Sequence, residues 1–151
     1  MRFSLIYVDC PWSYTDKNAN GKRGACFKYP VMTLDDLKAL PVPDIAAEHC
    51  LLAMWWVSPQ PQEALDLVSA WGFTLKNMCG FTWHKLSKTG KKDHFGTGHL
   101  TRSNTENVLF ATKGRIKRVS ASVRGMITAP VGEHSAKPSE ARDRLVQLMG
   151  D

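Results

Sequence analysis

A carboxylate, a thiol, a proline and an indole follow one another in the segment Asp9-Cys10-Pro11-Trp12. The run before it, Leu5 to Val8, is apolar with β-branched and aromatic members, which predicts a buried strand. Pro11 has no N–H to donate to a sheet, so strand pairing ends there. These groups are therefore expected at the carboxyl end of a buried strand, the edge at which open α/β sheets bind ligands.

The same groups suit the transfer of a methyl group to an exocyclic amine of a base. The lone pair of such an amine is delocalised into the ring, so a site must accept hydrogen bonds from the NH₂ group and orient its nitrogen. The Asp9 carboxylate and the Cys10 main-chain carbonyl are two adjacent acceptors. Trp12 offers a flat face for a stacked base, worth about 1–3 kcal/mol. The tetrapeptide alone is equally compatible with a strand end at which Trp12 is a core residue.

The tetrapeptide resembles the Asp-Pro-Pro-Trp signature of the MT-A70 family of S-adenosylmethionine-dependent adenine N6-methyltransferases. Residues 98–106, Gly-His-Leu-Thr-Arg-Ser-Asn-Thr-Glu, are similar to the Thr-Arg-x-x-x-Glu region of that family. Residues 133–138, Glu-His-Ser-Ala-Lys-Pro, are similar to its His-Ser-x-Lys-Pro element. The three motifs occur in the family's order across nearly the whole chain. The set looks most like the small members found in phages and bacteria.

The resemblance implies a methyltransferase and gives its motif residues roles. The catalytic turn would be Asp9, Cys10, Pro11 and Trp12, and S-adenosylmethionine would contact Asp9, Cys10, His134 and Lys137. The substrate-binding residues would be Trp12, Tyr14, Lys85, Arg102, Asn104 and Glu106. The amine of a target adenine would attack the sulfonium methyl in line, with no covalent enzyme intermediate, after the base is flipped out of duplex DNA.

Two of these roles have structural alternatives. Without the resemblance, Lys137 is better explained as a solvated lysine before a helix. If the resemblance holds, the Lys137 ammonium would pair with the carboxylate of the cofactor. Glu106 is equally compatible with a substrate-facing position and with a buried ion pair to Arg102.

The chain departs from the family pattern in two places. Cys10 replaces the first proline of the signature, which keeps the carbonyl acceptor but loses the stiffness that proline gives. Family members continue past the Lys-Pro helix into a strand that contacts the ribose and adenine of the cofactor, whereas this sequence ends at Gly150-Asp151. We expect a single MT-A70-like domain over residues 1–151, with weak or absent cofactor binding in the monomer. An unpaired strand edge would favour a homodimer.

Another function class fits the same features. A catalytically silent nucleic-acid-binding domain, or a partner subunit of an active methyltransferase, would keep the basic loops and Trp12 but bind cofactor poorly. Titration with S-adenosylmethionine separates this alternative from the enzyme.

Length and composition fit one globular domain, with 151 residues of which 43% are hydrophobic. The start shows no signal peptide, and no apolar run is long enough to cross a membrane. These features predict a cytoplasmic protein with no membrane partner, and the resemblance implies that the cell is a bacterium or a phage-infected host. The four cysteines and five histidines have no metal-ligand spacing, so no metal is expected.

The formal net charge of +6 suits a polyanionic partner. The charge is concentrated in two stretches, Lys85, Lys88, Lys91 and Lys92 in the first and Lys113, Arg115, Lys117 and Arg118 in the second. Such runs are usually solvated loops. With the resemblance they predict nucleic-acid binding, and we prefer DNA to RNA because small phage-like members of the family are expected to act on DNA.

The remaining patterns predict the elements that position these motifs. Residues 13–29 are polar and Gly-containing, which indicates a lid or target-binding loop with Tyr14 beside the base, or else a disordered loop. Helices are expected over 33–40, over 61–71 and from Pro138, with strands over 50–57, 73–83, 107–112 and 117–123, and a loop over 84–102. The fold class is α/β, a Rossmann-like methyltransferase sheet, mostly parallel with an antiparallel hairpin.

Overall fold

The computed structural model describes residues 1–13 and 30–151, so Tyr14 and nearly all of the expected loop over 13–29 lie outside the described residues. The strands are β1 (Phe3–Asp9), β2 (Ala46–Trp56), β3 (Thr74–Leu86), β4 (Thr105–Lys113) and β5 (Met126–Pro130). The α-helices are α1 (Leu34–Ala39), α2 (Val42–Ile45), α3 (Pro61–Ala70) and α4 (Ser139–Met149), and Glu133–Ser135 is a 3₁₀ turn. This order and the mixed sheet are consistent with the Rossmann-like α/β fold that the sequence predicted.

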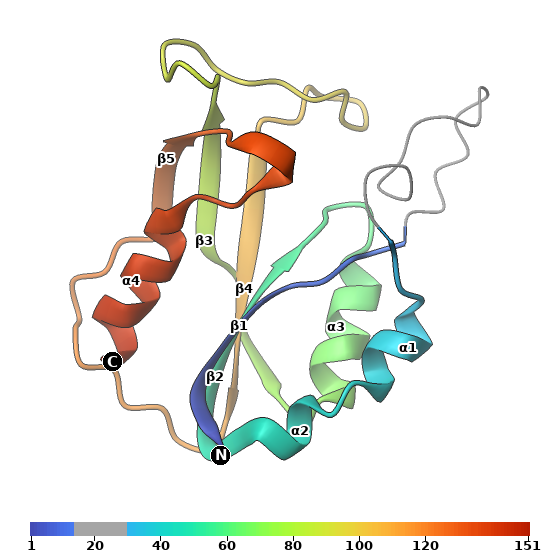
Figure 1. Ribbon diagram of the computed structural model, residues 1–151, viewed down its shortest axis with the longest axis vertical. Coiled ribbons are helices and arrows are strands. Elements are labelled where there is room, and N and C mark those ends of the chain that lie inside the picture. The colour runs from blue at the N-terminus through green and yellow to red at the C-terminus, as the bar shows by residue number, and fades with distance from the viewer. Residues whose placement is uncertain (14–29) are drawn as a thin grey trace.

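The strands of this part of the chain form one sheet in the order β1-β2-β4-β3-β5 (Figure 1). β1 pairs with β2, and β3 with β5, in parallel. β4 lies between β2 and β3 and is antiparallel to both. Asp9 is opposite Trp55, and Trp55 is opposite Val108, so β1, β2 and the start of β4 meet at one end of the sheet.

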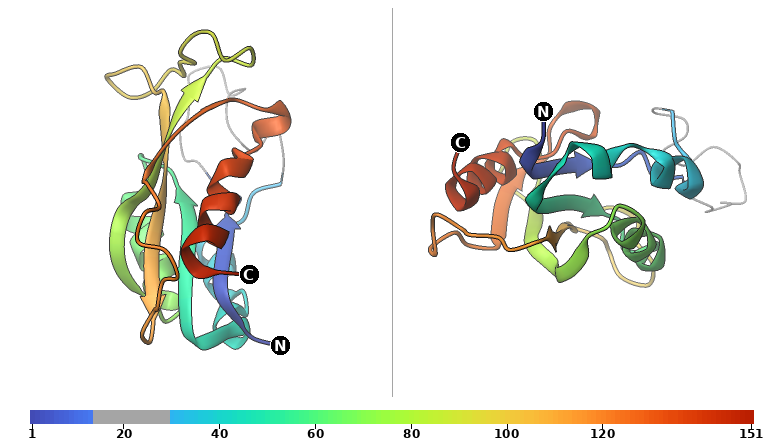
Figure 2. Two further views of the ribbon diagram at one scale, coloured as in Figure 1. Left: turned by 90° about the vertical axis from the view of Figure 1, so that its left-hand side faces the viewer. Right: turned by 90° about the horizontal axis from the view of Figure 1, so that it is seen from below.

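Both faces of the sheet are buried, because β2 turns alternate side chains to opposite sides. Leu52 and Met54 pack with α1 and α3 residues, among them Leu37 and Leu67. The residues of β2 that face the other way, among them Ala53 and Trp55, pack with Ala141 and Leu145 of α4 (Figure 2). A strand covered on both faces is apolar throughout, which is why residues 50–57 have no polar alternation.

Local signals set the ends of the helices. The Thr33 side chain accepts a hydrogen bond from the Asp36 N–H at 3.2 Å, so the predicted N-cap of α1 is confirmed. Pro41 and Pro43 end α1 as predicted, but they also start the short helix α2, because proline suits the first turn of a helix. α3 begins with Pro61 and is followed by Gly72 at φ +79°, a conformation that favours glycine.

The prediction of a strand over 117–123 was wrong. Residues 115–125 have no regular structure, and Ile116 and Val123 pack against the α4-side core. β5 follows instead, and it pairs in parallel with β3. The antiparallel pairing in the sheet is made by β4 with β2 and β3. β3 also extends three residues beyond Trp83 to Leu86, so His84 and Lys85 lie in the sheet rather than in the following loop. No helix in residues 1–13 and 30–151 is long and apolar enough to cross a membrane.

Candidate active site

The segment Asp9-Cys10-Pro11-Trp12 follows β1 directly, at the carboxyl end of the strand as predicted, although Leu5 to Val8 are half-buried at the edge of the sheet and not buried. Its turn is fixed by main-chain hydrogen bonds, since the Trp12 N–H donates to the Cys10 carbonyl at 2.9 Å and the Met32 N–H donates to the Pro11 carbonyl at 3.0 Å. The Trp12 indole N–H donates to the Trp55 carbonyl at 3.3 Å. The turn therefore holds the Asp9 carboxylate at a defined place on the edge of the sheet.

Trp12 is only 5% exposed and belongs to the core that α1 and α3 cover. Trp12 is therefore a core residue, which is one of the two positions compatible with the tetrapeptide. Stacking on a base would require this ring to be uncovered, and that role stays a prediction. The neighbouring Cys10 thiol is also buried, which raises its pKa to about 12 with a smaller contribution from Asp9, so it stays protonated at neutral pH.

Four charged side chains from distant parts of the chain meet beside this turn. The Glu106 carboxylate accepts from the Lys85 ammonium at 2.5 Å and from the Lys137 ammonium at 2.5 Å. The Lys137 ammonium also lies 3.7 Å from the Asp9 carboxylate. Of the two alternatives for Glu106, an ion pair does form, but its partners are the two lysines and not Arg102. Lys137 is paired rather than solvated, and it connects Glu106 to Asp9.

Each of the two ammonium groups in this ion-pair cluster lies over a tryptophan ring. The Lys137 ammonium lies 5.3 Å from the ring centroid of Trp55, and the Lys85 ammonium lies 5.3 Å from that of Trp83, both within cation–π range. The two rings meet edge to face, with centroids 6.1 Å apart. The Trp55 indole N–H donates to the Tyr7 hydroxyl at 2.7 Å. These aromatic residues were predicted only as strand residues, although each lies near the carboxyl end of a strand that reaches the site.

The surroundings shift the two carboxylates in opposite directions. Partial burial raises the pKa of Asp9, and the nearby Glu106 carboxylate adds to this, while Lys137 opposes it. Burial also disfavours the charged form of Glu106, but the ammonium groups of Lys137 and Lys85 outweigh it and hold the Glu106 pKa below its usual range. Glu106 is therefore a fixed negative charge at neutral pH. Asp9, whose side chain is 48% exposed, is the carboxylate open to a ligand.

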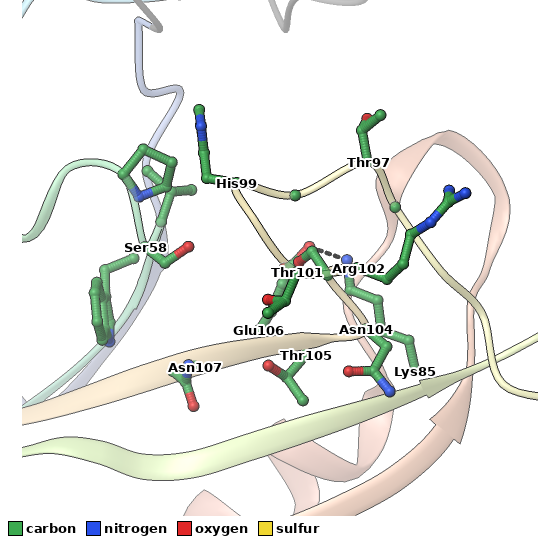
Figure 3. A pocket seen from close by; sticks show the side chains of 16 residues that line it. Ser58, Lys85, Thr97, His99, Thr101, Arg102, Asn104, Thr105, Glu106 and Asn107 are labelled. Carbon is green, nitrogen blue, oxygen red and sulfur yellow. Dashed lines mark hydrogen bonds and ion pairs between the residues drawn. The ribbon is translucent and has the colours of Figure 1, made fainter.

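A polar cavity of about 670 Å³ lies at the same end of the sheet. Residues 56–59 at and after the end of β2 form one wall, the loop residues 96–99 and 101–104 form another, and Glu106 and Asn107 of β4 form the floor (Figure 3). The cavity brings together four of the residues predicted to bind substrate, Lys85, Arg102, Asn104 and Glu106. In Figure 3 the Lys85 side chain meets Glu106 on the floor, whereas His99 and Thr97 lie on the loop above.

A second cavity of about 620 Å³ lies on the other side of the Lys85–Glu106 pair. Its lining includes Trp83, Lys88, His94 and the segment 131–136, which contains the predicted cofactor residue His134. His134 and Ser135 have φ values of +52° and +62°, so this turn is held in a conformation that non-glycine residues rarely adopt. The Lys85–Glu106 pair therefore lines both cavities, and Lys137 connects Glu106 to Asp9. In residues 1–13 and 30–151 no three His, Cys, Asp or Glu side chains are grouped as metal ligands.

Comparisons with known proteins agree with these motifs. A protein-family model, MT-A70, matches residues 3–149. A curated relative, the type II methyltransferase M.MunI of a Mycoplasma species, is 33% identical in an alignment 165 residues long. The alignment covers 97% of this chain and 67% of that protein.

Proposed function

This chain belongs to the MT-A70 family of methyltransferases, and we propose that it moves a methyl group from S-adenosylmethionine to the N6 amine of adenine in DNA. The observation that carries the proposal is the half-exposed Asp9 carboxylate at the end of β1, set beside the Lys137–Glu106 pair and close to a polar cavity. An accessible acceptor close to a polar cavity is what the orientation of an amine requires.

The Asp9 carboxylate accepts a hydrogen bond from the adenine amine and turns its nitrogen toward the methyl group. The Cys10 carbonyl already accepts the Trp12 N–H and has a second lone pair for the amine. The amine nitrogen then bonds to the methyl carbon as the carbon–sulfur bond breaks with its electron pair left on sulfur, and the methylated amine releases one proton to solvent water. The Cys10 thiol takes no part, since its raised pKa keeps it protonated.

The residues beside Asp9 fit the amino-acid end of S-adenosylmethionine, which supplies an activated methyl group when bound. That end carries one carboxylate and one ammonium group. The Lys137 ammonium complements the carboxylate, and the Asp9 carboxylate complements the ammonium, because the two side chains lie within 3.7 Å of each other. His134 lines the adjoining hollow. Lys137 keeps its bond to Glu106 in this arrangement and so is oriented before the donor binds.

DNA as the substrate is supported by the charge at the rim of the site. Lys88, Lys91 and Lys92 follow β3 in the loop that leads to the cavity wall, and phosphate contacts by such residues supply most of the non-specific affinity for DNA. The similarity to a protein named as a type II methyltransferase agrees with a small bacterial or phage-type enzyme.

A methyl-transfer assay tests the proposal. The protein is incubated with tritiated S-adenosylmethionine and randomised DNA, and the DNA is digested to nucleosides. We expect tritium in N6-methyl-2′-deoxyadenosine and none when purine, which lacks the amine, replaces adenine. Label in another nucleoside, or in none, contradicts the proposal. Calorimetric titration then separates the alternative, because a silent DNA-binding domain would bind DNA without saturable uptake of S-adenosylmethionine at roughly micromolar concentration.

The predicted homodimer stays a prediction. β1 is at one edge of the sheet and pairs on one side only, with β2, among the described strands. Exposed strand edges favour pairing with another chain. Light scattering at several protein concentrations, with and without S-adenosylmethionine, measures whether the chain self-associates.

A further inference from the structure

Leu100 is a fully exposed leucine at the turn of the loop between β3 and β4. Its φ of +65° places it in the left-handed region, which residues with a Cβ rarely occupy. Among the large hydrophobic residues of the described chain it has the greatest exposed fraction. An exposed leucine alone is ordinary, but one held in a disfavoured backbone conformation calls for another explanation than stability.

The loop that carries Leu100 is well defined. Gly96 and Ser103 form an antiparallel bridge, and the Gly96 N–H donates to the Ser103 carbonyl at 2.6 Å. The Thr101 N–H donates to the His99 carbonyl at 2.7 Å. Gly98 has a φ of +59°, and a Cβ there would lie 2.1 Å from the Thr101 carbonyl oxygen, so only glycine allows this turn. The exposure of Leu100 therefore follows from a closed turn.

The two sides of this turn differ. His99 and Thr101, the neighbours of Leu100, line the polar cavity next to Glu106, whereas Leu100 is not part of the lining. The same three residues thus form a polar wall toward the cavity and an apolar tip toward the outside. The preceding residues of the loop include Lys91 and Lys92, which suit a phosphate backbone.

We propose that Leu100 is a wedge that enters the base stack of duplex DNA and fills the space left by the target adenine while that base occupies the cavity. Enzymes that act on a base in duplex DNA must unstack it, and apolar side chains inserted between bases stabilise such distorted DNA. Leu100 is adjacent in sequence to the cavity wall, so one loop can hold the flipped base and replace it in the stack. This inference rests on the proposed function, because it assumes that a base of duplex DNA enters the cavity.

The test uses Leu100→Ala, which removes the wedge, and Leu100→Met, which keeps most of its size. Val119→Ala is the matched control, since Val119 is 69% exposed in the loop before β5 and lies outside the cavity. Each variant is given duplex and single-stranded oligonucleotides in the methyl-transfer assay. Base flipping is measured separately from the fluorescence of 2-aminopurine that replaces adenine in a pool of randomised duplexes.

We expect Leu100→Ala to lower the rate on duplex DNA about tenfold or more, while the rate on single strands changes less than about twofold, because single strands need no unstacking. The rise in 2-aminopurine fluorescence should fall in parallel. Leu100→Met and Val119→Ala should behave like the wild type. Equal losses on duplex and single strands, or unchanged rates on both, would overturn the wedge.

Failure of the proposed function gives a different result. If the wild type methylates neither substrate but raises the 2-aminopurine fluorescence in a manner that depends on Leu100, the wedge stands and the proposed reaction falls. If the wild type raises no fluorescence in the duplex pool, the wedge is wrong, whatever the rate on single strands.

Discussion

The two ends of the sheet carry similar positive charge but differ in what surrounds it. At one end, the carboxyl ends of β1 and β2 meet Asp9, the Lys85–Glu106–Lys137 cluster and the polar cavity. At the other end Lys113 is opposite Cys50, near the start of β2, and begins the second basic stretch. The hollow next to that stretch has a volume of about 540 Å³, and its lining includes Leu51, Phe81 and Phe110.

Local contacts hold the main chain at the start of the second stretch and at the start of β5. The Arg115 N–H donates to the His49 ring nitrogen at 3.2 Å. Gly114 has a φ of +64°, and a Cβ there would lie 2.3 Å from the same ring nitrogen. The Arg144 guanidinium donates to the carbonyls of Arg124 and Met126 and so anchors the start of β5 to α4. Whether a run of basic residues borders a candidate site depends on the sheet edge at which it lies, and the run alone does not reveal that edge.

We expect the largest difference in methyl-transfer rate between two variants that each replace one carboxylate, one at each end of the sheet. Asp9→Ala removes the acceptor for the amine and should lower methyl transfer by about 10²–10³-fold or more, as loss of one oriented catalytic hydrogen bond does. Asp44→Ala, an exposed carboxylate in α2 before β2, should change nothing. Rates from the tritium assay, with melting temperatures to verify the fold, decide this.

Asp9→Asn should also fail, because an amide can turn its NH₂ group toward the amine and keep the size of the side chain. If an Asp9 variant retains most of its activity, the active site does not lie at this end of the sheet.

The elements at the end of the sheet that carries Asp9 were predicted better than those at the opposite end, because their signals lie within a few residues of each other in the sequence. Asp9 at the end of β1, the Thr33 cap and the helix that begins with Pro61 depend on neighbours within a few residues. The segment 117–123 has only scattered apolar residues, and its Ile116 and Val123 pack on the core without pairing. Whether such a stretch forms a strand depends on whether another strand has a free edge beside it.

The ion-pair cluster could be predicted only in part. The resemblance to known motifs identified Asp9, Glu106 and Lys137 one by one, but their contacts depend on strand order. Glu106 is opposite Trp83 in the register of β3 and β4, which brings Lys85 to the same edge. No spacing within one segment encodes a pair that is 21 or 31 residues apart in the chain. The burial of Trp12 was undecidable for the same reason, since it depends on α1 and α3.

The second prediction compares a partly buried ion pair with an exposed one. Glu106→Gln removes the carboxylate that two ammonium groups share, each on a side chain no more than 20% exposed. We expect the free energy of unfolding to fall by about 2–3 kcal/mol at pH 7, less than for a fully buried pair. Glu133→Gln breaks the pair with Lys88, whose side chains are 63% and 73% exposed, and should cost almost nothing. Urea denaturation measures both.

The sign of the pH dependence is fixed by the direction of the Glu106 shift. Its pKa is lowered in the folded protein, so its stabilisation is fully present above the pKa of the unfolded chain and is lost as the pH falls through the folded value. The stability difference between wild type and Glu106→Gln should therefore shrink below about pH 4. A difference that is constant from pH 7 to pH 3 would show that charge is not its cause.

The third prediction compares the two basic stretches directly. Replacing Lys88, Lys91 and Lys92 by alanine should weaken DNA binding about equally for all sequences and reduce the salt slope by up to about three charges. Replacing Arg115, Lys117 and Arg118 removes the same formal charge at the far end and should leave the slope unchanged. Fluorescence anisotropy at several salt concentrations gives both slopes. Equal effects of the two triple variants would mean that DNA contacts both ends.

The smallest effect is a shift in the pH profile of methyl transfer. The Asp9 carboxylate is a much stronger acceptor for the amine when it is ionised. Burial together with the Glu106 charge raises its pKa, so the rate should fall on the acid side at a higher pH than for an ordinary aspartate. Glu106→Gln removes one of the two groups that raise this pKa and leaves Lys137, 3.7 Å from Asp9, to lower it. The acid limb of the variant should therefore move to lower pH, whatever happens to its maximal rate. Glu133→Gln, which is not among the groups that shift Asp9, should keep the wild-type limb. An unmoved or upward-moved limb in Glu106→Gln would show that a group other than Asp9 limits the reaction in acid.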